Sequence, residues 1–457
     1  MPGTLDALYK RYAYWLGGAA AFLLPLKLPL AYCALVPALV CLLLKLRDGT
    51  FRATLAPLKH IFVPLLLFII LAQISSLFGI NPLRSTEKLI GLTFFALSIV
   101  FYFDIVREHG YSRILTALFA GQSIASLHSV LNGAFPELLP VVFPGQVTES
   151  GQLAISLTMA TGMALYLSSE INGGNRPAFS PAKSADLVLW GITNFFLLSI
   201  LAFAPTFHLH GIMVTTLLVI SLASLVLAVI MPLRAARSSG NERSTLLILL
   251  MTVVLPLFSA ALMVNLKRGP WAGVLISSLL LLFLYGRKFL VPTLLLVLAL
   301  IFYVEPVYTR LQDAPDHFFI AGGRARIWEI GAELVTRYPL GIGFKNSNFL
   351  RSFSPDIPPQ LVHFHSNLLN VAAETGWIAL MAYIWWIASI LRLAFHRPFA
   401  ARESILISAL GAAVLAWQVA GAVEYNFGDS EVLLVAYLTI GTLAGLLSRG
   451  GQRNEHK

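Results

Sequence analysis

Hydrophobic residues gather along this sequence in long runs that short polar stretches separate. Residues 62–71 and 275–284, for example, contain no charged side chain. A helix of about 20 apolar residues crosses the hydrocarbon core of a bilayer, so these runs predict transmembrane helices. The predicted spans cover 14–30, 31–45, 60–78, 89–106, 113–131, 151–168, 186–204, 211–231, 245–264, 271–285, 289–304, 367–391, 404–423 and 431–447.

The pattern predicts an all-α integral membrane protein with about fourteen transmembrane helices. The number ranges from about twelve to fourteen because Pro25, Pro29 and Pro37 interrupt the first two runs, and proline breaks helices. The expected organisation is a bundle of eleven spans, a long loop, three further spans and a tail, over residues 1–304, 305–366, 367–448 and 449–457.

The long loop contains a helical pattern of its own. Between Arg324 and Tyr338 the apolar residues recur near helical spacing, and Pro339 and Gly341 follow as stop signals. We therefore expect one or two short helices in this loop, lying against the membrane bundle.

Composition supports the membrane assignment. Hydrophobic residues make up 57% of the 457 residues and charged residues only 12%, whereas soluble domains carry about 25% charged residues. The net charge of +10 does not indicate nucleic-acid binding, because the basic residues lie in short clusters between apolar runs. Cys33 and Cys41 share one apolar run and form neither a metal-ligand motif nor a disulfide framework.

The distribution of basic residues predicts the orientation. Short translocated loops disfavour Lys and Arg. With the N-terminus inside, most of the 32 Lys and Arg residues fall in cytoplasmic segments, which places both termini in the cytoplasm and favours an even number of spans. The loop 305–366 then lies outside, and the short outside loops contain only Lys27, Arg84, Lys88, Lys267 and Arg268.

Polar residues are costly in a bilayer, so their positions are informative, and the first notable group lies where the long loop meets the twelfth span. His363, His365 and Asn367 occur within five residues. A histidine can accept a proton near neutral pH and act as a general base. The group would equally suit an interfacial anchor with a helix cap. Glu374 follows His365 by nine residues, which is about 900° on a continuous helix and places the two on opposite faces. Glu374 is therefore a poor partner for His365 and suits a helix–helix hydrogen bond.

A second group of polar residues is Lys267-Arg268, in a tight outside turn between the ninth and tenth spans. Two cations there oppose the orientation rule. A guanidinium can bind phosphate oxygens in two-point geometry. The alternative is that both side chains extend to the lipid headgroups beside Trp271.

The remaining polar candidates are more ambiguous. Arg324 and Arg326 precede the loop helix and could bind an anion, although Arg326 can also pair with Glu329 at helical spacing. Gln152, near the start of the sixth span, suits a packing hydrogen bond as well as a ligand contact. The acidic residues before the last span suit either helix capping or acceptor contact: Glu424, Asp429 and Glu431.

Several of these stretches resemble the bacterial O-antigen ligase and polymerase family of membrane glycosyltransferases. In that family a histidine precedes Asn, Ser or Gln, nine residues and Gly-x-x-Gly. Here nine residues separate His365-Ser366 from Gly376, and Ala379 replaces the last glycine. This change affects close helix packing and not the histidine. Residues 267–271, Lys-Arg-Gly-Pro-Trp, are similar to the family's Ser-Arg-Gly-x-Trp turn, with Lys267 in place of serine.

Further matches follow in the same order along the chain. Residues 323–328 together with 339–343 resemble the family's loop signature, and Asp429-Ser430-Glu431 before the last span is also similar. The matches cover the C-terminal half from Arg268 onward. The N-terminal half is similar only in its hydropathy.

The resemblance implies an enzyme of lipopolysaccharide biosynthesis in the bacterial inner membrane. It implies transfer of a glycan from undecaprenyl diphosphate to lipid A-core or another glycan acceptor at a periplasmic site, without metal, nucleotide or other cofactor. Membrane lipids are the other expected partners, nucleic acid is not, and the sequence does not fix the oligomeric state. His365 is the expected catalytic base and Arg268 the expected catalytic cation. The candidate substrate-binding residues are Arg324, Arg326, Lys267, His363, Asn367 and Gln152.

Two alternatives to a ligase remain. A polymerase of the same family would extend another lipid-linked repeat unit, although the histidine spacing favours a ligase. A transporter or flippase of lipid-linked sugars belongs to a different class. Transporters place polar sites near the bilayer midplane, where this sequence has few polar residues, and no two-half symmetry is visible.

Overall fold

The computed structural model describes residues 2–46, 55–136, 145–172, 181–239, 242–319, 323–353, 355, 362–396 and 401–455. All secondary structure in these residues is helical. The helices are α1 (Pro2–Leu23), α2 (Leu28–Lys45), η1 (Ala56–Leu58), α4 (Lys59–Phe78), α5 (Pro82–His109), α6 (Ser112–Ala134), α7 (Gln146–Asn172), α8 (Pro181–Ala202), α9 (Ile212–Ser239), α10 (Glu242–Leu249), η2 (Leu250–Val254), α11 (Leu255–Val264), α12 (Arg268–Tyr285), η3 (Arg287–Phe289), α13 (Leu290–Tyr303), α14 (Glu305–Gln312), α15 (Ala314–Phe319), α16 (Arg324–Arg337), η4 (Ser347–Phe349), α17 (Leu350–Phe353), α18 (Asn367–Phe395), α19 (Ala401–Ala420) and α20 (Ser430–Glu455).

In the described part of the chain, eleven helices are long and apolar enough to cross a membrane, or twelve if α13 and α14 form one bent span. The protein is therefore a multi-pass membrane protein. Every predicted span overlaps a helix, but α1, α7 and α13 are not among the eleven. α13 has only 14 residues, and α7 contains polar residues such as Gln152 and Thr158. The number of about fourteen spans thus stays a prediction.

The predicted boundary between the first two spans, at residues 30 and 31, is wrong. α1 ends at Leu23 and α2 begins at Leu28. Pro29 lies in the first turn of α2, where a missing backbone N–H breaks no helical hydrogen bond. Pro37 lies inside α2, which continues past it to Lys45. One of the three prolines thus belongs to a helix start.

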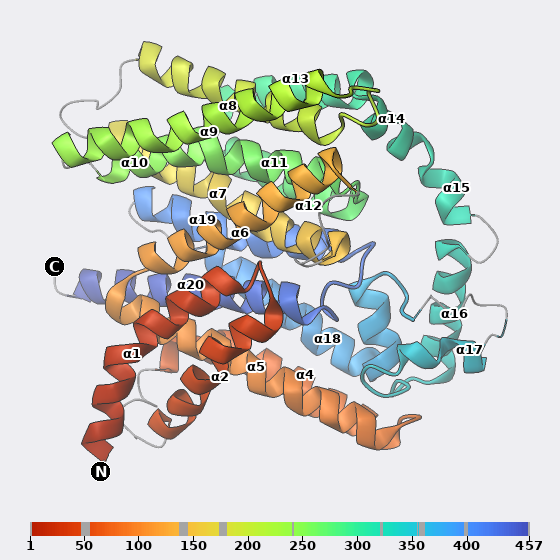
Figure 1. Ribbon diagram of the computed structural model, residues 1–457. Coiled ribbons are helices and arrows are strands. Elements are labelled where there is room, and N and C mark those ends of the chain that lie inside the picture. The colour runs from red at the N-terminus through yellow and green to blue at the C-terminus, as the bar shows by residue number, and fades with distance from the viewer. Residues whose placement is uncertain are drawn as a thin grey trace.

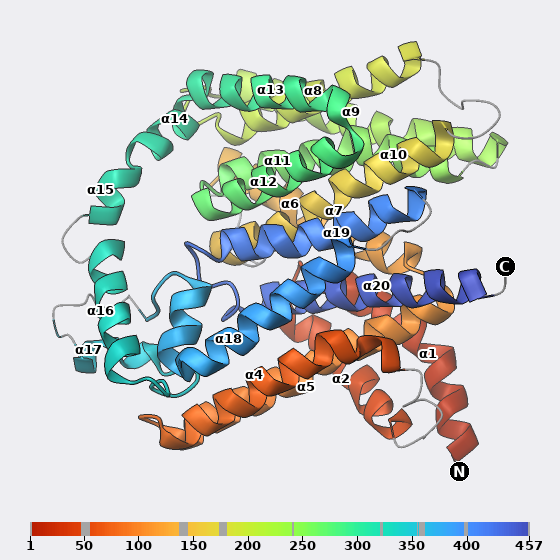
Figure 2. The same ribbon diagram turned by 180° about the vertical axis from the view of Figure 1, so that it is seen from behind.

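The helices lie roughly side by side, and the segment between α13 and α18 occupies one end of the bundle (Figure 1). We call this the loop end. The first turn of α1 and the last turn of α20 lie at the opposite end, as Figure 2 shows from behind. α20 continues as a helix to Glu455, through most of the residues expected to form a tail.

The last three long helices meet in a buried aromatic cluster. Trp386 of α18 packs edge-on against Trp417 of α19, with ring centroids 6.3 Å apart, and against Tyr437 of α20 at the same separation. Tyr383 of α18 packs against Trp386 at 5.9 Å. Aromatic pairs prefer such edge contacts. The cluster fixes α18, α19 and α20 relative to one another.

Close packing of α12 on α19 depends on a small residue. A Cβ atom at Gly273 would lie 2.4 Å from the carbonyl oxygen of Ala416. Small residues let membrane helices approach closely, and the resulting van der Waals contacts replace the hydrophobic force that is absent between helices in lipid. The contact places the first residue of α12, Arg268, beside the end of α19.

A break in α18 anchors the segment that precedes it. Gly376 has φ +83° inside the helix, a conformation that favours glycine. The break leaves carbonyl groups that accept hydrogen bonds from the 339–343 stretch: Ile342 N donates to Ala373 O and Gly343 N to Glu374 O, both at 2.9 Å. The 339–343 stretch and the stretch around Gly376, both part of the family resemblance, are therefore joined by hydrogen bonds that hold the start of α18 in place.

Segment 305–366 contains more helix than expected. The predicted helix at 324–338 is present as α16, but α14, α15 and α17 accompany it. These three have only 8, 6 and 4 residues. Their patterns are too short for a periodicity argument, which needs a window of about 11 residues. α16 packs its apolar side against α18.

Candidate functional site

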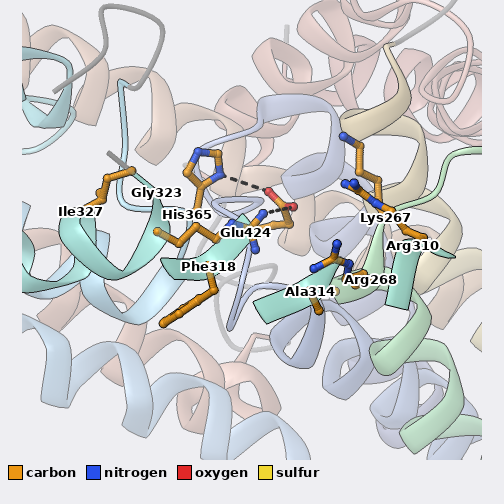
Figure 3. Close-up of a pocket in the computed structure, with 11 residues that line it drawn as sticks. Lys267, Arg268, Arg310, Ala314, Phe318, Gly323, Ile327, His365 and Glu424 are labelled. Atoms are coloured by element: carbon orange, nitrogen blue, oxygen red, sulfur yellow. Dashed lines mark hydrogen bonds and ion pairs between the residues drawn. The ribbon is translucent and has the colours of Figure 1, made fainter. Parts of the chain in front are cut away.

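A cavity of about 280 Å³ lies at the loop end of the bundle (Figure 3). Distant parts of the chain converge there, from the turn before α12 to the loop after α19. The lining contains both residues on which the sequence analysis depends most, Arg268 and His365. The complete lining is Lys267, Arg268, Gly269, Arg310, Ala314, Phe318, Gly323, Arg324, Ile327, His365 and Glu424.

The electrostatics of the cavity are cationic. Among the described residues, its lining contributes four basic side chains, Lys267, Arg268, Arg310 and Arg324, against one carboxylate, Glu424. A concave site lined by one sign of charge focuses the field and attracts ligands of the opposite sign. The cavity is therefore suited to an anion.

Three hydrogen bonds hold the turn that presents Lys267 and Arg268. Leu266 has φ +48°, and its carbonyl accepts a hydrogen bond from Arg310 Nε at 3.1 Å. Trp271 Nε1 donates to Leu262 O at 2.8 Å, and Asn265 Nδ2 donates to the buried Glu149 carboxylate at 3.2 Å. The turn is thus fixed from both sides before any ligand is considered.

Arg268 is incompletely paired. Its Nε and Nη2 atoms are buried and have no hydrogen-bond partner among the described residues. Most buried polar side-chain atoms have a partner, and each exception calls for an explanation. Arg268 also lines the cavity, and a guanidinium that retains unpartnered donors can bind an oxyanion in two-point geometry.

His365 lies directly before α18 in a left-handed conformation, with φ +50°. The next residue, Ser366, caps the helix by accepting from Leu369 N at 3.4 Å. His365 Nδ1 faces Glu424 Oε2 at 3.4 Å, and Arg324 Nη2 donates to Glu424 Oε1 at 2.9 Å. A carboxylate at Nδ1 favours the tautomer that carries its proton there, which leaves Nε2 as the basic nitrogen.

Glu424 remains a carboxylate in this arrangement. Burial acts to raise its pKa, but the hydrogen bond with His365 and the positive charge of Arg324 outweigh burial, and the pKa lies below its ordinary value. A carboxylate oriented by a cation and facing a histidine can stabilise the imidazolium that forms when the ring accepts a proton.

His363 supports the backbone of His365. Its Nδ1 accepts a hydrogen bond from His365 N at 3.2 Å, and the two rings meet edge-on with centroids 4.2 Å apart. Burial, and then the charge of His365, lowers the pKa of His363 to about 4. His363 is therefore neutral near pH 7 and adds no charge beside His365.

This lowered pKa predicts a pH dependence of stability. Between pH 6.5 and about 4 the unfolded chain binds a proton at His363 that the folded protein does not bind. The free energy of unfolding therefore decreases as the pH is lowered through this window. The thermal midpoint of the wild-type protein in detergent should fall more steeply there than that of His363→Gln. Parallel pH profiles for the two proteins would contradict the prediction.

Four of the candidate substrate-binding residues are not part of the cavity lining: His363, described above, and three others. Arg326 pairs with Glu329 at 2.7 Å. Asn367 is buried, donating from Nδ2 to Asn426 Oδ1 at 2.7 Å and accepting from Phe427 N at 2.9 Å. Gln152 is buried in α7 and donates to Leu24 O at 3.2 Å. Asn367 thus joins α18 to the loop before α20.

Two polar lining residues were not among the sequence-based site candidates. Glu424 belonged to the ambiguous acidic group before the last span, and only its contact with His365 distinguishes it from Asp429, whose Oδ1 caps α20. Arg310 lies in the short helix α14, without a recognisable motif. As expected, Glu374 does not contact His365: it accepts from Tyr425 Oη at 3.1 Å and from a backbone N–H.

Within the described ranges, no group of three or more His, Cys, Asp or Glu side chains is arranged to hold a metal ion.

A comparison with known protein families finds a match within the C-terminal half of the chain. Residues 252–384 match the family model described as O-antigen ligase. The match includes the Lys267-Arg268 turn, the loop segment, His365 and the break in α18, but ends before Glu424. No curated protein matches the sequence. The family match confirms the resemblance that the sequence motifs indicated.

Proposed function

We propose that this protein is an O-antigen ligase-like glycosyltransferase. It transfers a glycan from undecaprenyl diphosphate to lipid A-core at the cavity of the loop end. The observation that carries the proposal is the pair of unpartnered guanidinium donors of Arg268 in the cavity that His365 also lines. A site that combines unpartnered cationic donors with an oriented base suits the transfer of a glycosyl group from a diphosphate.

The donor already carries the chemical activation. The anomeric carbon of its first sugar is bonded to a diphosphate oxygen, which leaves with the electron pair of that bond. Arg268 neutralises the charge that develops on the leaving oxygen, with Lys267 and Arg310 on the same side of the cavity (Figure 3). Preorganised donors aimed at developing charge lower the barrier most effectively. Undecaprenyl diphosphate is the released product.

His365 activates the acceptor in the same step. Its Nε2 takes the proton of an acceptor hydroxyl as that oxygen bonds to the anomeric carbon, and Glu424 stabilises the resulting imidazolium through Nδ1. The acceptor attacks from the face opposite the diphosphate, so the anomeric configuration is inverted. The proton leaves His365 to water after the product departs.

The orientation of the chain supports a periplasmic site. Along the sequence, most Lys and Arg residues fall on the side of the membrane opposite the loop 305–366, and this excess is typical of the cytoplasmic side. The cavity at the loop end then faces the periplasm of the inner membrane. Lipid A-core and a lipid-linked glycan are both accessible from that side.

A deletion strain tests the proposal and separates it from its alternatives. Loss of a ligase leaves lipopolysaccharide core without O-chain, so the gel should show core alone, and the intact gene should restore the ladder. Core capped by a single repeat unit would instead indicate a polymerase. An unchanged ladder, or flipping of the lipid-linked glycan by proteoliposomes without any acceptor, would overturn the transferase proposal.

A further inference from the structure

The cavity has two chemically different sides. Lys267, Arg268 and Arg310 lie on one side in Figure 3, and Phe318 and Ile327 lie on the other. His365 and Glu424 lie between these groups in the same view. The cationic side is sufficient to hold a diphosphate. The apolar side suits a ligand group of a different kind.

Phe318 is held in a defined orientation. Trp328 contacts it edge-on, with ring centroids 5.3 Å apart and an interplanar angle of 89°. Trp328 is itself fixed, because its Nε1 donates to Phe364 O at 2.9 Å. Phe364 is buried and directly precedes His365. The aromatic ring in the cavity is thus connected to the histidine through two successive contacts.

The position of Phe318 relative to the membrane indicates which part of the donor it meets. Arg268 is the first residue of the membrane-crossing helix α12, whereas Phe318 belongs to α15 in the loop segment. Figure 1 shows α15 and α16 beyond the ends of the long helices. In the proposed function the diphosphate binds at Arg268, so a polyprenyl chain that follows the apolar helices would leave the glycan directed toward α15.

We propose that Phe318 is a stacking platform for the first sugar ring of the donor, the pyranose that is bonded to the diphosphate. This inference rests on the proposed function. A pyranose presents a face of C–H groups, whose partial positive charge suits the negative face of an aromatic ring. Stacking on Phe318 fixes the ring between Arg268 and His365, so the anomeric carbon is oriented for attack.

Equilibrium binding to the purified full-length protein tests the platform. The probes are undecaprenyl diphosphate and undecaprenyl diphosphate bearing one N-acetylglucosamine. Wild type should bind the sugar-bearing lipid about three- to tenfold more tightly than the bare lipid, as expected for one aromatic contact. Phe318→Leu, which keeps apolar volume but lacks a ring, should lose this preference and keep its affinity for undecaprenyl diphosphate. Phe318→Trp should retain the preference.

The neighbouring aromatic residue provides a matched control. Phe319 is 74% exposed and is not part of the cavity lining, so Phe319→Leu should keep the wild-type preference. Equal weakening of both lipids by Phe318→Leu, or an unchanged preference, would overturn the platform. If wild type fails to bind undecaprenyl diphosphate at all, the proposed function fails instead. Thermal midpoints of all variants report whether folding is intact.

Discussion

Replacing His365 by alanine is expected to lower the rate of glycan transfer by about 10²–10⁴-fold, the range typical of a lost general base. The acceptor hydroxyl is a weak nucleophile until its proton leaves, and the structure orients Nε2 of His365 for this task through the Nδ1 contact with Glu424. The measurement is transfer from undecaprenyl-diphosphate-linked glycan to lipid A-core by purified protein. Donor binding should change little, because the cationic residues remain.

Two companion variants sharpen this test. His210 is exposed in the turn between α8 and α9, so His210→Ala should transfer at the wild-type rate. Glu424→Gln should slow the reaction less than His365→Ala, and adding it to His365→Ala should cause no further loss, because residues that act as a unit are not additive. Retained transfer by a folded His365→Ala protein would remove the base assignment.

The helices of this fold could be predicted from sequence because the bilayer imposes a local rule. Each membrane helix must satisfy its own backbone hydrogen bonds and expose apolar side chains, so a single run of residues suffices to indicate it. The α16 pattern was also visible, because its 14 residues cover several turns. At the N-terminus the prediction failed locally, since Pro29 lies in the first turn of α2 instead of interrupting a helix.

The site was predictable only in part. A sequence gives the chemical type of each side chain, but not which side chains from distant parts of the chain lie close together. Arg268 is recognisable because a cation in a short outside loop opposes the orientation rule, and His365 because it is a histidine at a helix start. Both residues line one cavity. Glu424 did not stand out, because 59 residues separate it from His365. Arg326 shows the opposite failure: it lies only two residues after Arg324 at the same helix start, but this offset of about 200° around the helix places it beside Glu329 and not in the cavity lining.

The convergence of the site depends on helix packing that no single motif encodes. Backbone contact between Asn367 N and Gly421 O at 2.6 Å joins the start of α18 to the end of α19. The close approach at Gly273 places the start of α12 beside the same region. The histidine, the carboxylate and the arginine therefore meet because three helices share one junction. Substitutions at this junction should change the geometry of the site without removing any of its functional groups.

Replacing Arg268 by alanine is expected to reduce transfer by about 10²–10³-fold, the loss typical of one preorganised donor at developing charge. Affinity for undecaprenyl diphosphate should fall with it. Arg268→Lys should recover only part of the activity, because an ammonium keeps the charge but cannot bind two oxygens through a planar fork. Transfer assays and equilibrium binding of the bare lipid diphosphate measure both effects.

Stability separates this functional role from a structural one. Because Nε and Nη2 of Arg268 have no partner among the described residues, the alanine variant loses no hydrogen bond at these atoms and removes a poorly compensated charge. Its thermal midpoint should therefore equal or exceed that of wild type while its activity falls. Arg287, exposed in η3 just beyond the C-terminal end of α12, is the matched control, and Arg287→Ala should bind the lipid normally. If Arg268→Ala binds undecaprenyl diphosphate as tightly as wild type, the guanidinium does not hold the leaving group, and the proposed mechanism loses its cation.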